Sequence, residues 1–388
     1  MNRLLASILL ASSLALSSTA AFAATSSIPV PSPPQVQANG YILLDYASGR
    51  VLAEQRSAER MDPASITKLM TAYLVFKALK EKRLRLDEGV LVSERAWRIG
   101  GAVSDGSTSF IPVNSRVKAE DLIKGMIVQS GNDATIALAE RLGGTEPAFV
   151  EQMNSAAKNL GMKGTNFDNS WGGPSPVHYS SAADIAVLSR ALIKEFPEYY
   201  RYYSMQEFTF NGHTQRNRNG LLTRGIGVDG LKTGHTQSAK YCLVTSAKRN
   251  NMRLVSVVLG SPSIKAREDA SAALLNYGFT FYETVKLHEG RKMMLKPRIY
   301  KGTEEFLSVG TTSDLYVTVA RGEGGALLKN AEVKGPLMAP IKKDATVGEF
   351  TVSAGGQVIA HQPLVALVEV PEGGLFHRLS DSVRLWFQ

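Results

Sequence analysis

The sequence predicts an α+β domain, then a small all-β domain and a C-terminal amphipathic helix. Strand patterns stand at both ends of residues 39–284 and helical patterns fill the middle, which is typical of a domain whose ends share one antiparallel sheet flanked by helices. From Val285 onward, short alternating runs are separated by Gly, Pro and Lys, as in small β domains. With 388 residues, 44% hydrophobic and 20% charged, the chain is neither disordered, collagen-like nor built of many membrane spans.

Residues 1–23 have the three parts of a secretory signal peptide. Arg3 supplies a positive charge, residues 4–16 form a short apolar run, and Ala21-Phe22-Ala23 is a small-residue cleavage site. A membrane-spanning helix needs about 20 apolar residues, so cleavage is favoured over the alternative of a permanently retained anchor. We therefore expect an exported protein, in which the single cysteine, Cys242, has no partner for a disulfide within the chain.

The larger domain, residues 39–284, follows a proline-rich linker at residues 24–38. A β-hairpin is predicted around Ser48-Gly49, where two apolar runs meet at a turn. A long helix is predicted from Ser65 to Arg83, because Pro63 precedes an apolar, helix-forming run that ends in basic residues. Other helices are expected at residues 119–142, 146–160, 181–194 and 270–284, and strands at residues 207–210, 241–247 and 253–259.

The smaller domain, residues 285–370, contains no catalytic constellation and has strands predicted at residues 315–319, 350–353 and 364–368. The pattern changes again in residues 371–388. Apolar side chains recur there at helical spacing with charged residues between them, at Leu375, Phe376, Leu379, Val383, Trp386 and Phe387. This spacing predicts an amphipathic helix.

Three short motifs carry candidate chemistry, and they are Ser65-Ile-Thr-Lys68, Ser130-Gly-Asn132 and Lys232-Thr-Gly234. The first pattern is expected about once or twice by chance in a chain of this length, and it does recur at Ser155-Ala-Ala-Lys158, inside a helical run with no second constellation. In a chain of this length, each of the other two tripeptides would occur by chance only about a tenth of a time or less. The three in this order are therefore specific, although each alone also fits a helix cap, a turn or a strand start.

Ser65 lies where a helix begins and Lys68 lies one turn further on, so both side chains are on one face. A serine hydroxyl becomes a nucleophile when a base takes its proton. A lysine can be that base if burial and a neighbouring cation disfavour its ammonium form. Lys232 could be this cation if its strand runs beside the helix, and the helix N-terminus would offer backbone N–H groups to a developing oxyanion.

The second and third motifs offer groups that fit a peptide substrate. Ser130 and Asn132 flank a glycine, so on a bend the hydroxyl could relay a proton to a leaving amine while the amide holds a carbonyl. Lys232 and Thr233 would present a cation and a hydroxyl to a substrate carboxylate. Gly234 would let another backbone segment approach closely.

With their flanking residues, the motifs resemble the penicillin-binding D-alanyl-D-alanine carboxypeptidases, serine peptidases that remove the terminal D-alanine from peptidoglycan pentapeptide stems. The resemblance covers nearly the whole mature chain and rests on Pro63-Ala-Ser-Ile-Thr-Lys68, Gln129-Ser-Gly-Asn-Asp-Ala134 and Gly230-Leu-Lys-Thr-Gly-His-Thr236. It implies a catalytic domain with the β-lactamase/transpeptidase-like fold, a part in cell-wall synthesis and cell shape, no cofactor, and inhibition by β-lactam antibiotics such as penicillin.

The resemblance also implies a role for each residue. Ser65 would be acylated by the carbonyl of the penultimate D-alanine, with Lys68 as base, and water would then hydrolyse the acyl-enzyme. Ser130 and Lys232 would form the proton path to the leaving nitrogen. Asn132 would bind the peptide, and Thr233, Arg218 and Arg267 would bind the carboxylate. Lys232 and Gly234 of the third motif would also contact the substrate. The backbone N–H groups of Ser65 and His235 would form the oxyanion hole.

In this family the C-terminal segment lies as a helix on the outer face of the inner membrane. Trp386 and Phe387 suit such an interface, but the charges of residues 371–388 nearly cancel, so we expect weak anchoring. The alternative is that the helix packs on its own domain. The resemblance thus implies a periplasmic protein attached peripherally to the inner membrane.

Two other functions stay open as alternatives. A serine β-lactamase of class A would need a Glu-x-x-x-Asn element, and the only such spacing between the second and third motifs, from Glu207 to Asn211, lies too close to Lys232 for that role. A non-catalytic envelope scaffold would not need the intact Ser65 and Lys68. The net charge of +9 comes without a basic-aromatic motif, so no nucleic-acid partner is expected, and the six histidines lack metal-ligand spacing, so no metal is expected either.

Overall fold

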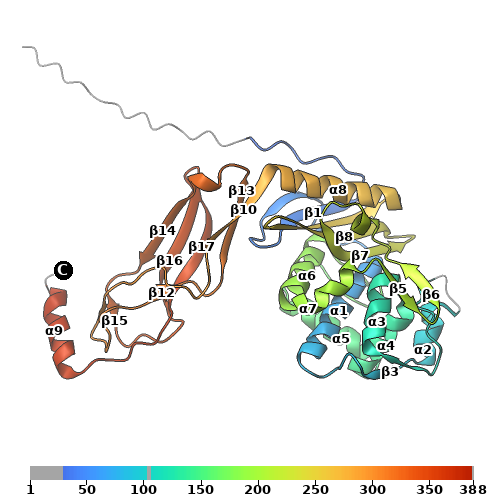
Figure 1. The fold of residues 1–388 in the computed structure, drawn as a ribbon, viewed down its shortest axis with the longest axis horizontal. Helices are drawn as coiled ribbons and strands as arrows, with labels where there is room; N and C mark the ends of the chain where they lie inside the picture. The colour runs from blue at the N-terminus through green and yellow to red at the C-terminus, as the bar shows by residue number, and fades with distance from the viewer. Residues whose placement is uncertain (1–28, 103–105, 387–388) are drawn as a thin grey trace, which may run out of the picture.

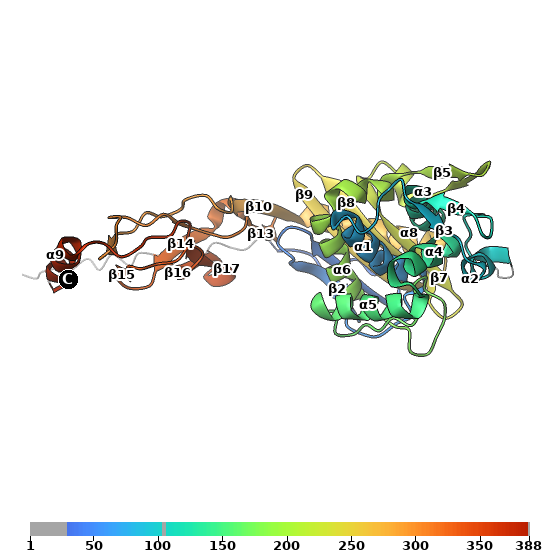
Figure 2. The same ribbon diagram turned by 90° about the horizontal axis from the view of Figure 1, so that it is seen from below.

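The structure is a computed structural model and describes residues 29–102 and 106–386. Figures 1 and 2 show a larger body of helices around a sheet, a narrower β-rich body beside it, and a terminal helix at the far end. The predicted signal peptide at residues 1–23 and the first part of the predicted linker lie outside the described residues. The described part of the linker, residues 29–38, has no helix or strand.

The larger body is built on one five-stranded antiparallel sheet in the order β2-β1-β9-β8-β7. As the sequence predicts, strands from the two ends of the domain lie side by side, with Tyr41 of β1 opposite Val258 of β9. The strands are β1 (Gly40–Asp45), β2 (Val51–Gln55), β7 (Val228–Thr236), β8 (Lys240–Arg249) and β9 (Met252–Ser261).

Alternation along the strands gives the sheet two buried faces. On β1, Ile42 and Leu44 belong to the core formed with α1, α4, α5 and α6, whereas Tyr41 and Leu43 belong to the core formed with α8. The sheet is thus the middle of three layers, and the nucleophile motif lies in the larger helical layer. The main helices are α1 (Lys68–Lys80), α4 (Asn132–Gly143), α5 (Glu146–Asn159), α6 (Ala182–Glu195) and α8 (Ile264–Phe281).

Shorter elements surround the helical layer. They are the helices α2 (Glu94–Trp97), α3 (Ala119–Lys124) and α7 (Pro197–Tyr200), and the paired strands β3 (Gly89–Leu91) with β4 (Arg116–Lys118) and β5 (Glu207–Phe210) with β6 (His213–Arg216). Single turns of helix are η1 (Ala64–Thr67), η2 (Arg98–Ala102), η3 (Gly125–Gln129), η4 (Arg201–Ser204) and η5 (Gly220–Thr223).

Three elements of the structure differ in detail from those that the sequence predicts. The helix predicted at 119–142 is interrupted, because the wide turn η3 and the left-handed Ser130 separate α3 from α4. The strand predicted at 207–210 pairs with β6 in a separate hairpin instead of joining the main sheet. The helix predicted at 270–284 begins at Ile264, where the Ser263 side chain accepts a hydrogen bond from the Ala266 N–H, and it ends at Phe281.

The β-rich body has a four-stranded sheet in the order β12-β17-β16-β14 and two smaller pairs. Its core includes Val317, Phe350 and Leu364, one from each of the three predicted strand regions. Its elements are β10 (Tyr282–His288), β11 (Ile299–Tyr300), β12 (Val309–Gly310), β13 (Leu315–Ala320), η6 (Gly324–Ala326), β14 (Leu328–Val333), β15 (Leu337–Met338), β16 (Thr346–Ala354) and β17 (Gln357–Ala366).

Hydrogen bonds join the two bodies at the first hairpin. The carboxylate of Asp45 is fully buried and accepts hydrogen bonds from Ser48 and from Thr284 Oγ1, the latter at 2.6 Å. Ser48 Oγ also lies 2.6 Å from Thr318 Oγ1 on β13. The hairpin predicted around Ser48-Gly49 therefore contacts the β-rich body directly.

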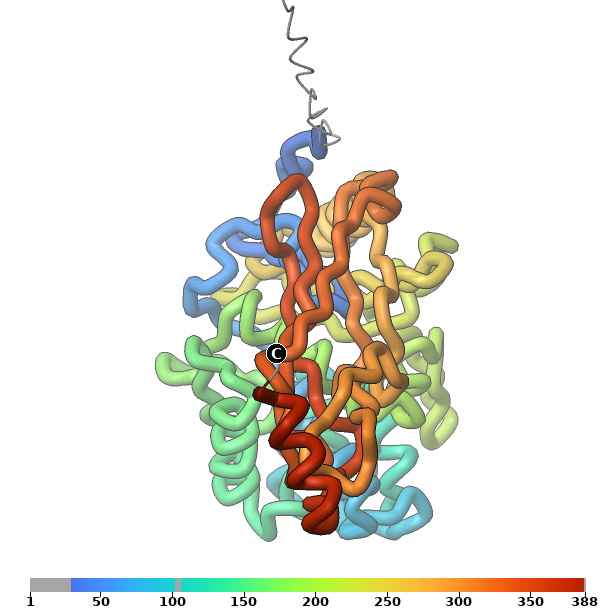
Figure 3. The backbone as a smooth tube through the Cα atoms, turned by 90° about the vertical axis from the view of Figure 1, so that its left-hand side faces the viewer, coloured from blue at the N-terminus to red at the C-terminus, as the bar shows by residue number. Residues whose placement is uncertain are grey.

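The last helix, α9 (Leu375–Trp386), lies at the end of the β-rich body, nearest the viewer in Figure 3. One carboxylate fixes it there, since Asp381 is buried and accepts a hydrogen bond from the Lys301 N–H at 2.6 Å. Its apolar side chains point away from the protein, and Phe376 is 91% exposed. Among the described residues, no helix has the length and apolarity to span a membrane.

Candidate active site

The three motifs meet at one cleft of about 620 Å³. It lies between η1, β7 and the segment that leads into α4. Eight of the ten predicted site residues line it, namely Ser65, Ser130, Asn132, Arg218, Thr233, Gly234, His235 and Arg267. The other two, Lys68 and Lys232, are buried behind this surface at 1% and 3% exposure.

The helix predicted from Ser65 begins at Lys68 as α1, and Ser65 lies in the preceding turn η1. The Lys68 Nζ donates to Ser65 Oγ at 3.0 Å, to Asn132 Oδ1 at 2.8 Å and to the Trp171 carbonyl at 2.6 Å. The second Ser-x-x-Lys pattern, at Ser155, lies within α5 and outside the cleft. Only the first pattern therefore brings its serine and lysine into the site.

Burial lowers the pKa of both lysines. The pKa of Lys68 is lowered from 10.5 to about 7, chiefly by the loss of hydration and also by the positive charge of Arg218, while the carboxylate of Asp133 opposes the shift. Burial, together with the charges of Lys68, Arg218 and Arg267, holds the pKa of Lys232 well below that of an exposed lysine. The sequence predicts Lys232 as the cation that disfavours the ammonium form of Lys68. The positive charge that lowers the pKa of Lys68 is instead that of Arg218, whereas the charge of Lys68 lowers the pKa of Lys232.

The bend at Ser130 brings the second motif into the cleft. Ser130 has a left-handed backbone with φ of 60°, a conformation that costs a non-glycine residue energy and is common at functional sites. At Gly131, a Cβ would lie 2.1 Å from Ser109 Oγ, so a larger residue would force the Ser109 side chain to move. Asn132 then begins α4, and its N–H donates to the Ser107 carbonyl at 2.8 Å.

A buried carboxylate holds the loop that passes this bend. Asp133, 1% exposed, accepts hydrogen bonds from the N–H groups of Ser109 and Ile111 and from Thr108 Oγ1. These charge-assisted contacts fix residues 108–111 against the start of α4.

The third motif lies on the edge strand β7, which packs beside η1. A Cβ on Gly234 would lie 2.9 Å from the Pro63 carbonyl, in agreement with the predicted close approach. Lys232 Nζ donates to the Thr233 carbonyl at 3.2 Å. The exposed ring of His235 lies against Tyr241, with ring centroids 4.3 Å apart.

Two arginines bring positive charge to the same end of the cleft. Arg267 of α8 is 4% exposed and donates weakly to the carbonyls of Gly234, Cys242 and Arg218, at 3.3 to 3.4 Å. Its Nε has no hydrogen-bond partner among the described residues. Arg218 is exposed at the surface and lines the cleft. A buried guanidinium with an unused hydrogen-bond donor fits an anionic ligand.

Sequence reasoning missed the segment at residues 168–178, which closes the site behind Lys68. The Trp171 carbonyl receives a lysine hydrogen bond, and Gly172 lies so close to η1 that a Cβ would be 1.9 Å from the Ala64 carbonyl oxygen. Asp168 N–H donates to His178 Nδ1, which leaves His178 Nε2 as the protonated nitrogen, 2.7 Å from Thr67 Oγ1. The run Asn169-Ser-Trp-Gly-Gly173 was the available signal, since such residues favour tight turns.

Comparison with known proteins gives a matching family model in each body. Residues 28–263 match the family described as D-alanyl-D-alanine carboxypeptidase, and residues 282–372 match the C-terminal domain of penicillin-binding protein 5. The D-alanyl-D-alanine carboxypeptidase DacA of Escherichia coli is 41% identical over 366 residues, which cover 92% of this chain and 90% of that protein.

Comparison with solved structures points to the same family. Penicillin-binding protein 5 from Haemophilus influenzae matches with a TM-score of 0.84 at 41% identity, over 88% of this chain and 100% of that chain. Penicillin-binding protein D2 from Listeria monocytogenes, solved in an ampicillin-bound form, matches with a TM-score of 0.58 at 31% identity, over 64% of this chain and 100% of that chain. The matches confirm the fold class and the resemblance that the motifs predict, and the chain belongs to the D-alanyl-D-alanine carboxypeptidase family of serine peptidases.

Proposed function

We propose that this carboxypeptidase works through an acyl-enzyme on Ser65, with Lys68 as the general base. The contacts of Lys68 suit a neutral amine. The oxygens of Asn132 and Trp171 can only accept, so when Lys68 is neutral they take its two N–H groups. The lone pair then replaces the third donor, the one that faces Ser65 Oγ in the ammonium form. The hydroxyl proton passes to this lone pair as the oxygen attacks the carbonyl of the penultimate D-alanine.

Negative charge then develops on the carbonyl oxygen and a proton must reach the leaving nitrogen. The backbone N–H groups of Ser65 and His235 form the oxyanion hole in this proposal, one from η1 and one from the adjacent strand β7. Ser130 and Lys232 supply the proton path to the leaving D-alanine. Support for this path comes from their burial and from the lowered pKa of Lys232, which makes its proton easier to give up than that of an exposed lysine.

Substrate specificity rests on the free carboxylate of the terminal D-alanine. Thr233 offers a hydroxyl, and Arg218 and Arg267 offer charge at the same end of the cleft. The unpartnered Nε of Arg267 supports this role, because a bound carboxylate would satisfy a buried donor that has no partner among the described residues. Asn132 binds the peptide backbone, and Gly234 keeps β7 close to η1.

Water hydrolyses the acyl-enzyme in the final step and frees Ser65. A β-lactam would acylate the same serine, as the ampicillin-bound relative suggests, and would be released slowly. The substrate in this proposal is the peptidoglycan pentapeptide, so the enzyme serves cell-wall synthesis and cell shape.

Location is part of the proposal. Residues 1–23 direct export to the periplasm, and residues 371–388 attach the protein peripherally to the inner membrane. Support comes from α9, where Phe376 and Trp386 are 91% and 89% exposed while the polar Asp381 faces the β-rich body.

One observation carries the function: the buried amine of Lys68 lies 3.0 Å from Ser65 Oγ with its other two donors engaged. The test is release of D-alanine from a pentapeptide ending in D-Ala-D-Ala, measured for the wild type, Ser65→Ala and Lys68→Ala. We expect both variants to lose more than about 99% of the activity, because each removes one half of the nucleophile and base pair. A Ser65→Ala protein that cleaves the peptide as well as the wild type would overturn the proposal.

A further inference from the structure

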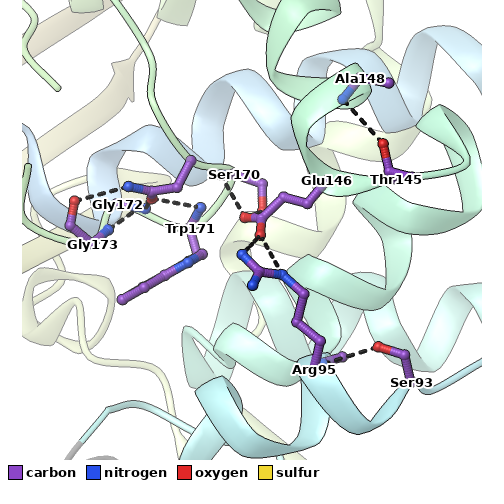
Figure 4. Close-up of polar contacts among 11 residues, drawn as sticks. Ser93, Arg95, Thr145, Glu146, Ala148, Ser170, Trp171, Gly172 and Gly173 are labelled. Atoms are coloured by element: carbon purple, nitrogen blue, oxygen red, sulfur yellow. Dashed lines mark hydrogen bonds and ion pairs between the residues drawn. The ribbon is translucent and has the colours of Figure 1, made fainter. Parts of the chain in front are cut away.

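A buried carboxylate outside the proposed chemistry lies close behind Lys68. Glu146 is the first residue of α5 and is 3% exposed. Figure 4 shows its carboxylate between Arg95 and Ser170, next to the turn formed by Trp171, Gly172 and Gly173. Carboxylates are rarely buried to this extent unless every oxygen is paired.

Both oxygens of this carboxylate are used. One accepts from the N–H of Ser170 at 3.0 Å and from its Oγ at 2.7 Å. The other accepts from Arg95 Nε at 3.1 Å and Nη2 at 2.6 Å. The guanidinium of Arg95 thus fixes the carboxylate, and the carboxylate fixes Ser170 through two separate donors.

The same peptide segment touches α1 on its other side. The Ser170 carbonyl accepts from Thr71 Oγ1 at 2.6 Å, and the next carbonyl, that of Trp171, accepts from Lys68 Nζ at 2.6 Å. Lys68 and Thr71 are neighbours on one face of α1. Residues 170 and 171 are therefore held between the start of α5 and the start of α1.

We propose that Glu146, fixed by Arg95, is a positioning residue for the base of this enzyme: through Ser170 it holds the Trp171 carbonyl that directs the Lys68 amine at Ser65. This inference rests on the proposed role of Lys68. Without the carboxylate, the buried N–H and hydroxyl of Ser170 lose their acceptor, and the segment moves to find another. The Trp171 carbonyl then no longer fixes the amine.

The expected change in pH dependence has a definite sign. A carbonyl acceptor favours the ammonium form, so its loss lowers the pKa of Lys68. The charged groups that face Lys68 from other elements are Arg218, Asp133 of α4 and Lys232 of β7, and a change at position 146 leaves all three in place. The midpoint of the rise in activity with pH should therefore move to lower pH while the maximal rate falls.

The test measures the rate of Ser65 acylation by penicillin against pH, with the full chain. For Glu146→Ala we expect the maximal rate to fall at least about tenfold, since small displacements at a reacting centre are costly, and the midpoint to fall by roughly half a pH unit. Glu146→Gln keeps an oxygen opposite Ser170, so its effect should be smaller.

The matched control is Thr145→Ala, one residue away. Thr145 caps the same helix by accepting the Ala148 N–H at 3.3 Å, and Figure 4 draws no hydrogen bond between Thr145 and Ser170. Its loss should lower the melting temperature while leaving the midpoint and the maximal rate unchanged.

Two results would overturn the inference: a folded Glu146→Ala protein with the wild-type midpoint and rate, or a Thr145→Ala protein with the same shift as Glu146→Ala. If Glu146→Ala does not fold, Glu146→Gln decides the question by the same comparison. Failure of the proposed base is a separate result, because it would be seen as acylation of Lys68→Ala with Glu146 intact.

Discussion

At the scale of single residues, the site depends on two lysines whose burial lowers their pKa values and so favours the loss of their charge. Lys68 and Lys232 approach each other from α1 and β7, and Arg218 adds a third positive group. Two ammonium ions so close together in a poorly hydrated place would repel each other, so loss of a proton is favoured. The same crowding that disfavours charge makes Lys68 able to accept a proton.

This charge state predicts the pH dependence of acylation. The pKa of Lys68 is lowered to about 7, so below that pH it is an ammonium ion and cannot act as a base, whereas above it the amine is free. The rate of acylation by penicillin should rise as the pH passes about 7 and then level off. Rapid-mixing kinetics from about pH 5 to about pH 9 give the profile.

The control for this profile is Lys68→Arg, which places a group in the site that stays protonated throughout the range. It should be acylated at no pH. A wild-type rate that does not change across the range would contradict the role of Lys68.

The sequence predicted the groups that carry chemistry in their side chains, but not the main-chain group that orients them. The Trp171 carbonyl could not be foreseen, because every residue has a carbonyl and only the fold decides which one meets Lys68. Glu146 likewise resembles any acidic residue in the first turn of a helix. Its burial depends on Arg95 and Ser170, which are distant in sequence.

At the scale of secondary structure, the catalytic site lies where a helix is interrupted. The apolar pattern of residues 119–142 is continuous, so it predicted one helix, yet the chain breaks at Ser130 and turns its side chain to the cleft. Tertiary contacts compensate for the break, since Asp133 binds the neighbouring loop. By contrast, the start of α8 had a signal in Ser263, a common helix-capping residue.

The close approach of residues 169–173 to η1 predicts the effect of Gly172→Ala. Gly172 has φ of +89°, and a Cβ would lie 1.9 Å from the Ala64 carbonyl oxygen. The substitution should lower the free energy of unfolding by about 2 to 4 kcal/mol and reduce acylation, because the segment must move away from Ser65 and Lys68. Thermal denaturation and the acylation rate are the measurements.

Gly161→Ala is the matched control for backbone strain. Gly161 also has a left-handed backbone, with φ of +79°, but nothing lies within 4 Å of its Cβ position. It should cost only about 1 kcal/mol and leave acylation unchanged. Equal effects of the two substitutions would show that contact with η1 plays no part.

At the scale of the whole molecule, the β-rich body separates the catalytic cleft from α9. Figure 1 places α9 at one end of the long axis and the helices around the cleft toward the other. The sequence predicted the two bodies from their change of pattern, but the bonds that join them, such as Asp45 to Thr284, have no local signature. This arrangement suits an enzyme that is held at a membrane and acts at a distance from it.

Removal of residues 371–388 should therefore leave catalysis intact and abolish membrane attachment. We expect an unchanged rate of acylation in solution, because α9 lies against the β-rich body, where Asp381 accepts the Lys301 N–H, and none of its residues lines the catalytic cleft. Sedimentation with anionic lipid vesicles should fall several-fold, since the exposed apolar side chains of α9 are lost. Replacement of Leu379 and Trp386 by Ser should have the same effect, and undiminished sedimentation of either variant would contradict the proposed attachment.

Mass spectrometry of the intact protein after incubation with penicillin decides whether Ser65 is the nucleophile. We expect a gain of one penicillin mass, located by digestion on the peptide that contains Ser65, and no gain for Ser65→Ala. An adduct on another residue, or an adduct that persists in Ser65→Ala, would contradict that role of Ser65.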